Sequence, residues 1–305
     1  MVPRILVIRL SALGDFVLSF GPFAAIRDHY PDGDITLLTT APYAELARSA
    51  PWFDHVVIDR RPAWWNLPGI YRLAKSLQGF DFVFDLQTSG RSSKYFRLAG
   101  RPKWSGISAG CSHPQLGDAR EHMHTIERQR DQLQLAGVEE FPRPDLSFLT
   151  DAPAPALPDR FAFLVPGAAP QRPAKRWPVH NFAELATALA GRGVIPVVIG
   201  GRGEANLAAV ISAACPQAID LTGQTTMAQL FAVAARASVA IGNDTGPMHI
   251  AASVGCPSVV LFSADSNPDM TAPRLPGGGW PVVLRRPDLA QLDVDSVIAA
   301  ASALV

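Results

Sequence analysis

The chain has 305 residues, of which 48% are hydrophobic, and its 27 basic and 27 acidic side chains give a formal net charge of zero. This balance excludes the basic footprint of a nucleic-acid-binding protein, and the length predicts two domains of ordinary size. The three cysteines lie far apart and form neither a zinc-site nor a disulfide spacing, which favours a reducing, cytoplasmic location. No apolar run is long enough to span a bilayer, and the first ten residues lack the apolar core of a signal peptide.

Short apolar strands alternate with amphipathic helices in the first half of the chain. The predicted strands are residues 5–8, 35–38, 55–58 and 82–84, and predicted helices include 16–29 and 67–77. Each strand is almost continuously apolar, as in a parallel sheet that helices cover on both faces. The proline-rich stretch 150–160 is the predicted boundary between a first domain, 1–150, and a second domain, 151–305.

The same alternation restarts after this boundary. The predicted strands are 161–165, 194–199, 218–221, 239–241 and 258–262, and the predicted helices are 181–192, 204–214, 227–235 and a closing helix 293–304. Two such halves predict an α/β protein with two doubly wound, Rossmann-like domains that direct their strand ends into a central cleft. The closing helix is expected either to stay with the second domain or to pack back on the first domain.

The most informative segment lies between the strands 239–241 and 258–262. Residues 242–247 combine turn formers with helix N-cap types, and Pro247 suits a first helical turn, where its missing N–H costs nothing. The N-terminus of such a helix offers free N–H groups and a positive dipole end, which favour phosphate. The alternative is an ordinary strand-to-helix turn. His249, one turn further, is expected to pack or support the site rather than to catalyse.

Asp15 follows the first strand, at the start of a predicted helix. It is either a simple helix cap or a carboxylate base that faces the cleft, and Gly14 beside it lets a substrate approach closely. In the second half, Lys175 is the only lysine and lies beside Arg176 in an irregular loop that follows a strand and Gly167. A compact ammonium suits phosphate, although a solvated pair of cations remains the alternative.

Other candidates have competing interpretations. Glu204 follows a Gly-Gly-Arg-Gly loop and either binds a ribose hydroxyl or caps the next helix. The arginines at 60 and 61 lie near two tryptophans and form either a basic acceptor pocket or an ordinary charged surface. Residues 106–110 match the nucleophile-elbow pattern around Ser108, but Pro114 argues against the helix that this motif requires, so hydrolase chemistry is not expected.

Four segments together resemble the heptosyltransferase family, glycosyltransferase family 9, which builds the inner core of lipopolysaccharide. They are residues 8–15, residues 165–168 with 175–178, residues 220–226, and residues 242–249 with 251–252. The resemblance implies a GT-B fold with the acceptor in the first domain and the nucleotide sugar, ADP-L-glycero-D-manno-heptose, in the second. Residues 222–225 read Thr-Gly-Gln-Thr where the family more often has Ala-Gly-Lys-Thr, and residues 60–125 match weakly.

The resemblance also implies roles for particular residues. Asp15 matches the catalytic base, Lys175 the lysine that contacts the donor diphosphate, and Asp244 to Gly246 the donor-phosphate loop. The complete set of expected donor-binding residues is Gly167, Lys175, Glu204, Thr225, Asp244, Thr245, Gly246 and His249. The expected acceptor-binding residues are Arg9, Ser11, Gly14, Arg60 and Arg61.

The predicted reaction is an inverting transfer of heptose from ADP-heptose to an inner-core or related glycan acceptor. Asp15 takes the proton of the acceptor hydroxyl, and no metal or other cofactor is expected, although a Mg²⁺ ligand role for Asp244 stays an alternative. A lipid-linked or core-oligosaccharide acceptor further implies peripheral contact with the inner face of the cytoplasmic membrane, and no nucleic-acid partner is expected. The alternatives are a GT-B enzyme or epimerase that uses another sugar nucleotide, and a non-catalytic nucleotide-binding protein.

Overall fold

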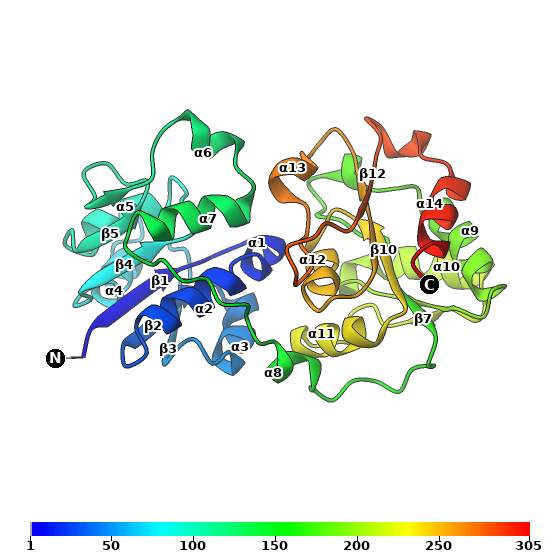
Figure 1. Cartoon of the computed structure of the whole chain (residues 1–305), viewed down its shortest axis with the longest axis horizontal. Coiled ribbons are helices and arrows are strands. Elements are labelled where there is room, and N and C mark those ends of the chain that lie inside the picture. Colours follow the sequence, from blue (N-terminus) through cyan, green and yellow to red (C-terminus); the bar gives the residue numbers. More distant parts are fainter. Residues whose placement is uncertain (1) are drawn as a thin grey trace. The chain divides into compact units, whose positions relative to one another are not determined.

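The computed structural model describes residues 2–305 and divides into two compact units, Met1–Asp145 and Leu146–Val305 (Figure 1). The division falls a few residues before the predicted boundary. The short helix α8 (Ser147–Thr150), which lies between the two positions, contacts α11 (Met227–Arg236) and therefore belongs to the second unit.

The first unit is built on one parallel sheet of six strands in the order β3-β2-β1-β4-β5-β6. The strands are β1 (Arg4–Ile8), β2 (Asp34–Thr39), β3 (His55–Ile58), β4 (Phe82–Asp85), β5 (Lys103–Gly106) and β6 (His113–Pro114). The β1 residue Ile8 pairs with Leu38 on one side and with Asp85 on the other. The strand order reverses between β1 and β4, as in a Rossmann sheet, and this reversal is the usual ligand position.

Helices connect these strands. They are α1 (Leu13–Val17), α2 (Phe20–His29), α3 (Ala41–Ser49), α4 (Leu67–Ser76), α5 (Ser92–Leu98), α6 (Asp118–His122) and α7 (Thr125–Gln134). The helix expected over 16–29 is in fact two helices, and the expectation was wrong there. The buried Ser19 donates its hydroxyl to the Asp15 carbonyl at 2.8 Å, a side-chain bond that accompanies the break between α1 and α2.

The second unit repeats the same topology in its own parallel sheet, β12-β11-β10-β7-β8-β9. Its strands are β7 (Phe161–Val165), β8 (Ile195–Val198), β9 (Ile219–Asp220), β10 (Val239–Asn243), β11 (Ser258–Phe262) and β12 (Val282–Arg285). In chain order, β7 takes the place of β1 and β10 the place of β4. The reversal between β7 and β10 is therefore the second position at which a ligand is expected.

The helices of the second unit cover its sheet. They are α8 and α11, named above, with η1 (Pro173–Lys175), α9 (Val179–Ala190), η2 (Arg202–Glu204), α10 (Ala205–Ala214), α12 (Gly246–Ser253), α13 (Pro268–Thr271), η3 (Leu289–Gln291) and α14 (Val294–Ser302). The closing helix α14 contacts α9 and β11 of its own unit. Within residues 2–305, no helix combines the length and apolar character needed to cross a bilayer.

Close packing of α12 against the sheet depends on Gly242. A Cβ atom at this position would lie 2.5 Å from the Cβ of Val165 and 2.9 Å from the sulfur of Met248. Both distances are far below van der Waals contact, so only glycine lets β10 and α12 approach this closely. The glycine thus fixes where the N-terminus of α12 emerges.

Candidate functional site

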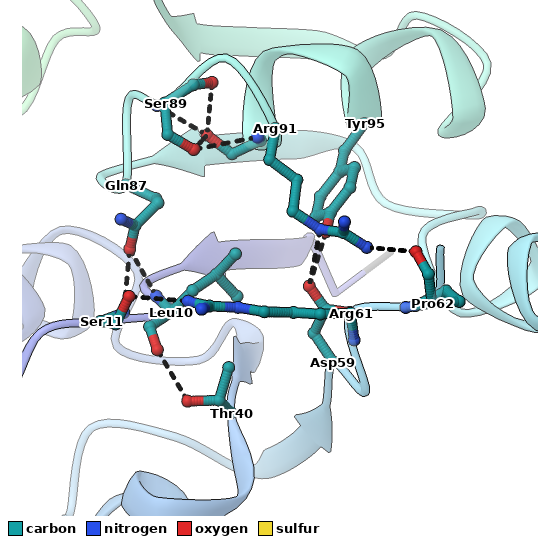
Figure 2. A network of polar contacts seen from close by, with 11 residues as sticks. Leu10, Ser11, Thr40, Asp59, Arg61, Pro62, Gln87, Ser89, Arg91 and Tyr95 are labelled. Atoms are coloured by element: carbon teal, nitrogen blue, oxygen red, sulfur yellow. Dashed lines mark hydrogen bonds and ion pairs between the residues drawn. The ribbon is translucent and has the colours of Figure 1, made fainter. Parts of the chain in front are cut away.

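In the first unit, the loop after β1 is tied to the loop after β4 at the strand-order reversal. The Oε1 atom of Gln87 accepts the N–H groups of Leu10 at 2.7 Å and Ser11 at 3.0 Å, while Thr40 donates its hydroxyl to the Leu10 carbonyl at 2.7 Å (Figure 2). These bonds satisfy backbone N–H and C=O groups of Leu10 and Ser11, which have no partner in the sheet, and they anchor the start of the loop. The residues that precede α1 are therefore fixed from both sides.

Asp15 lies in the first turn of α1 with its side chain 40% exposed. One carboxylate oxygen accepts the N–H of Ala12 at 3.2 Å, and the other lies 3.4 Å from the Nη2 of Arg9. The capping interpretation and the functional interpretation of Asp15 are therefore compatible, because the cap orients the carboxylate and leaves it accessible. An exposed, oriented carboxylate at the edge of a parallel sheet can accept a proton from a bound hydroxyl.

Arg9 is buried, and this changes what can be expected of it. Its side chain is 4% exposed, its guanidinium donates to the Leu86 carbonyl, and its second contact is with Asp15. Burial lowers the pKa of this guanidinium, while the nearby Asp15 carboxylate opposes that effect. The Arg9 guanidinium is therefore directed at Asp15 and the Leu86 carbonyl rather than at solvent.

A second carboxylate, Asp85, is fully buried at the end of β4. Burial raises its pKa to about 7, against the opposing effects of hydrogen bonds from Ser92 and two backbone N–H groups and of the charge on Arg9. The Nε2 of Gln132 donates to the Asp85 carbonyl at 3.1 Å. Sequence reasoning did not single out Asp85, because an aspartate that ends a strand usually marks a turn.

Arginines surround this edge of the first sheet. Arg61 has a left-handed φ of +48° and donates to the Ser11 hydroxyl at 2.6 Å, while Arg60 is exposed. Arg120, which the sequence analysis missed, donates to the hydroxyl of Thr88 at 2.7 Å. Thr88 is itself strained, with φ at +41°. Strained residues that converge on one edge are typical of ligand sites.

Arg128 of α7 completes this set of cations. Burial lowers the pKa of its guanidinium, and the Asp15 carboxylate opposes that shift. Its charge also lowers the pKa of Arg9 and of Arg120. The charges of Arg128 and Asp15 therefore act on each other and on the neighbouring arginines. Basic side chains thus contribute positive charge near the carboxylate of Asp15.

The second unit carries the equivalent cross-link at its own strand reversal. The side-chain amide of Asn243, at the end of β10, accepts the N–H of Trp177 at 2.9 Å and donates to the Pro166 carbonyl at 2.8 Å. The amide is fully buried. Asn243 thus joins both ends of the loop that carries Lys175, whereas Gln87 binds only the start of the segment that leads from β1 to α1.

The N-terminus of α12 follows directly after Asn243. Thr245 is the N-cap residue, its side chain makes no capping hydrogen bond, and Gly246 and a proline open the helix. The first N–H groups of a helix have no partner inside it, so those of Thr245 and Gly246 are directed outward beside the positive dipole end. This is the geometry of an anion-binding site.

Lys175 reaches this helix terminus from η1. Its ammonium forms an ion pair with Asp244, whose carboxylate also accepts the Ser266 hydroxyl at 2.7 Å and lies 3.9 Å from the Nε2 of His249. Asp244 does not cap α12, because Thr245 holds the cap position and Lys175 and Ser266 bind the Asp244 carboxylate. Asp244 instead fixes the lysine beside the helix end.

Glu204 lies over Gly167, near the start of the loop that follows β7. Its carboxylate accepts the N–H of Gly201 at 2.8 Å, and a Cβ atom on Gly167 would lie 1.6 Å from Glu204 Oε1. Glu204 occupies the N-cap position of α10 but makes no side-chain capping bond to that helix; its carboxylate instead caps the preceding turn η2. Gly167 is required because the carboxylate fills the space of a side chain. Thr225 lies in the loop before α11, next to Thr226, which caps that helix.

Ser108 has no hydrolase setting. A strand precedes it, because β5 ends at Gly106, but no helix follows it before β6. Its hydroxyl donates to the Ser93 carbonyl at 3.1 Å and is nearly buried. Among residues 2–305, no cluster of three or more histidine, cysteine or acidic side chains has metal-binding geometry.

The fold and the two strand-end sites define a glycosyltransferase of the GT-B class, with two Rossmann-like units. The family model of glycosyltransferase family 9 (heptosyltransferase) matches residues 70–276. The chain belongs to this family.

Related proteins agree with this assignment. The lipooligosaccharide heptosyltransferase 2 of Haemophilus ducreyi is 26% identical over 88% of this chain and 86% of its own length. The structure of E. coli ADP-heptose lps heptosyltransferase II has a TM-score of 0.77 at 23% identity and covers 99% of this chain and 98% of its own. E. coli heptosyltransferase WaaC with ADP has a TM-score of 0.79 at 20% identity, covering 99% and 100%. At these identities the two structures establish the shared fold.

Proposed function

We propose that this protein transfers heptose from ADP-heptose to an inner-core lipopolysaccharide acceptor, with inversion at the anomeric carbon and Asp15 as general base. The relatives support the proposal through their names, which specify heptosyl transfer to lipopolysaccharide or lipooligosaccharide and, for one structure, ADP-heptose. The single observation that carries it is the exposed carboxylate of Asp15, which a buried arginine and a helix cap hold in one orientation.

The first unit would bind the acceptor. The carboxylate of Asp15 removes the proton of the attacking hydroxyl as the new carbon–oxygen bond forms, a step typically worth about 10²–10⁴-fold in rate. The exposed side chain of Arg60 and the guanidinium of Arg61, with Ser11 and Gly14 beside them, would contact the acceptor. Cations of this kind suit the anionic groups of a sugar acceptor.

The second unit would bind the donor. As the bond between heptose and diphosphate breaks, its electron pair leaves with ADP, and the growing charge needs fixed donors. The N–H groups of Thr245 and Gly246 and the ammonium of Lys175 supply them. The Glu204 carboxylate, which has one oxygen committed to the Gly201 N–H, keeps its other oxygen for a ribose hydroxyl. Thr225 and His249 are proposed to border the same donor.

The chemistry needs no cofactor in this proposal. The ammonium of Lys175 already neutralises the carboxylate of Asp244, which would otherwise repel a diphosphate. A Mg²⁺ ion at Asp244 would have to displace this lysine. Transfer measured in EDTA should therefore proceed at the rate measured in Mg²⁺, and a requirement for the ion would return Asp244 to a metal-ligand role.

A nucleotide panel followed by product analysis tests the proposal. Because a ligand of the folded state raises its stability, ADP should raise the melting temperature more than UDP or GDP at equal concentration. ADP-heptose with truncated core acceptors should then yield a product one heptose heavier by mass spectrometry. Stronger stabilisation by UDP would indicate another sugar nucleotide, and ADP binding without any transfer would favour a non-catalytic nucleotide-binding protein.

The lipid-linked form of the acceptor would require the enzyme to work at the surface of the cytoplasmic membrane. We propose peripheral rather than spanning contact, since no helix in the described part of the chain could cross a bilayer. The first unit, which would hold the acceptor, is the unit expected to make this contact.

A further inference from the structure

The largest exposure of apolar side chains in the described chain is concentrated in one short segment of the first unit. Trp65 is 84% exposed, Leu67 72% and Tyr71 70%, and these are the highest values among the large hydrophobic side chains of residues 2–305. Single exposed apolar residues are common, but three within residues 65–71 form a local patch. The patch lies at the start of α4, outside the strand-end sites described above.

These side chains share one surface of α4. Leu67 and Tyr71 are four residues apart and Lys75 follows after four more, so all three lie along the same helical face. The opposite face of the helix buries Leu73 against the unit's core. Because α4 already packs on the core through Leu73, its exposed apolar face is not needed to attach the helix to the unit.

The segment that carries Trp65 is held rigidly. The buried carboxylate of Asp59 accepts the Tyr95 hydroxyl at 2.6 Å and the Arg61 N–H at 2.7 Å, and Arg91 donates to both Tyr95 and the Pro62 carbonyl (Figure 2). This network fixes the start of the turn that leads into α4. The exposed aromatic ring is thus presented from a defined backbone, and its exposure does not come from an unanchored loop.

The helix itself begins at a fixed point immediately after the tryptophans. Asn66 caps α4 by accepting the Gly69 N–H at 3.0 Å. A Cβ atom on Gly69 would lie 2.7 Å from the Cβ of Pro62, so the turn packs directly on the first helical turn. The ring of Trp64 lies 5.0 Å from both the Arg91 guanidinium and the Lys94 ammonium, which brings α5 beside the patch.

The two chain segments that form the patch carry basic side chains and no acidic ones. Residues 60–80 contain no acidic side chain and four basic ones, namely Arg60, Arg61, Arg72 and Lys75. Residues 86–117 again contain no acidic side chain and add Arg91, Lys94, Arg97, Arg101 and Lys103. This imbalance is local, because the whole chain is neutral. Basic side chains around exposed tryptophan, leucine and tyrosine complement an anionic bilayer surface, where headgroups attract the cations and aromatic rings enter the interface.

We propose that this aromatic–basic surface, formed by Trp65, Leu67, Tyr71, Arg72, Lys75 and Lys94, binds the surface of a bilayer that contains anionic phospholipids. The inference deepens the proposed function, because it rests on a lipid-linked acceptor being used at a membrane and names the surface that holds the enzyme there. Trp65 and its apolar neighbours enter the interfacial region, and the three cations contact phosphate groups. The lysine and arginine stems add apolar contact while their charges stay at headgroup level.

Vesicle binding by the full-length protein, without donor or acceptor, tests the surface directly. The protein should co-sediment with vesicles of phosphatidylglycerol and phosphatidylethanolamine, bind phosphatidylcholine vesicles weakly, and lose binding as salt rises. Trp65→Ala should reduce the partition coefficient about tenfold. Arg72→Ala with Lys75→Ala should reduce it by about fivefold for each cation removed.

Matched controls come from the second unit. Trp280 is 46% exposed, and Arg285 and Arg286 are an exposed pair of cations. Trp280→Ala and the double variant Arg285→Ala with Arg286→Ala should bind vesicles like the unsubstituted protein. Because the substituted side chains are exposed, thermal unfolding of each variant should match that of the parent, which excludes loss of folding as the cause.

Transfer to a delipidated core oligosaccharide separates this inference from the proposed function. Trp65→Ala should leave that reaction unchanged and slow transfer to acceptor embedded in anionic vesicles. The proposal that this surface binds membranes would be overturned if Trp65→Ala bound vesicles as well as its parent. It would also be overturned if the control variants lost as much vesicle binding as Trp65→Ala. A raised KM for the soluble acceptor with unaltered vesicle binding would overturn it as well and would make Trp65 a glycan-stacking residue. A protein that binds vesicles but transfers no heptose would overturn only the proposed function.

Discussion

The buried guanidinium of Arg9 lies 3.4 Å from the exposed carboxylate of Asp15, so a cation inside the first unit holds the proposed base at its surface. The Ala12 N–H binds the other carboxylate oxygen. With both contacts in place, the Asp15 side chain remains 40% exposed. In the proposed mechanism Asp15 takes the proton and Arg9 orients its carboxylate, and two substitutions can separate these roles.

Asp15→Asn should abolish most transfer and leave the donor site intact. The amide keeps the shape and the capping oxygen but cannot take a proton, so kcat should fall about 10²–10⁴-fold. The affinity for ADP, measured by calorimetry, should stay within about twofold. Asp295→Asn is the matched control, because Asp295 is also an acidic residue in the first turn of a helix. Retention of more than about a tenth of the activity would exclude Asp15 as the base.

Arg9→Gln should lower kcat with little change in the KM for the acceptor. The guanidinium is buried, so its loss disturbs the orientation of Asp15 without removing an acceptor contact. Loss of one properly oriented catalytic group typically costs about tenfold or more in rate. Arg60→Gln is the informative comparison, because Arg60 is exposed and should act mainly on KM. A pure KM effect of Arg9→Gln would return Arg9 to direct acceptor binding.

Lys175→Ala should weaken ADP binding about ten- to hundredfold. The variant removes a charge-assisted contact to the diphosphate, and it also leaves the Asp244 carboxylate unpaired beside it. Adding Asp244→Asn should therefore recover part of the affinity, and the cycle of single and double variants measures the coupling. Arg236→Ala, an exposed cation on α11, is the control. Unchanged ADP affinity in Lys175→Ala would remove Lys175 from the phosphate site.

The sequence allowed most of the fold to be predicted, because parallel strands that are buried on both faces are continuous apolar runs. The predicted strands 55–58, 161–165 and 258–262 have the bounds of β3, β7 and β11. The strands β5 and β6 were missed because they are short and mix polar residues with glycine and proline. The strand β12 was also missed, although Val282 to Leu284 are apolar. The break between α1 and α2 was missed although Gly21 and Pro22 lie in the first turn of α2, where proline commonly marks the start of a helix. Ser19 bonds to the Asp15 carbonyl at this break.

The candidate site could be located from the sequence but not assembled. Asp15, Lys175 and Asp244 stood out because they follow strands, where parallel sheets place ligands. Sequence spacing gave no sign that Asp244 pairs with Lys175 across 69 positions, or that Gln87 and Asn243 cross-link the two loops. Arg120 and Arg128 were not assigned to the site, since charged residues on helices usually face solvent. These contacts depend on tertiary packing, which a single sequence does not display.

Asp85 should make folding stability depend on pH. Its pKa is raised from 3.8 to about 7, so the folded state holds a proton that the unfolded state has released between those values. The contribution of Asp85 to the free energy of unfolding is therefore largest below pH 3.8, the pKa of the group in the unfolded chain. This contribution falls as the pH rises toward 7 and does not change further above pH 7. Between pH 5 and 8 the loss amounts to about 3 kcal/mol.

Asp85→Asn tests this directly, because an amide cannot ionise. The difference in the free energy of unfolding between variant and parent should grow in favour of the variant as pH rises from 5 to 8, measured by urea denaturation. Asp32→Asn, at an exposed position, should show no such trend. Parallel pH profiles for Asp85→Asn and its parent would mean that the Asp85 carboxyl is ionised throughout this range.

Two glycine substitutions should differ in their effect on stability. Gly242→Ala forces a methyl group within 2.5 Å of Val165 and should lower the free energy of unfolding by about 1–3 kcal/mol. Gly21→Ala, at the second position of α2, brings its methyl within 4 Å of no atom beyond its chain neighbours and should change the free energy of unfolding by less than about 1 kcal/mol, because helix propensity favours alanine while the following Pro22 disfavours it. Urea denaturation of both variants measures the difference.

Gly242→Ala should also weaken ADP binding, because the displaced α12 carries the N–H groups of Thr245 and Gly246. Gly21→Ala, in the other unit, should leave ADP affinity unchanged. Full ADP affinity in a destabilised Gly242→Ala protein would show that the phosphate contacts tolerate movement of α12. In that case the lysine, rather than the helix terminus, would supply most of the affinity for the diphosphate.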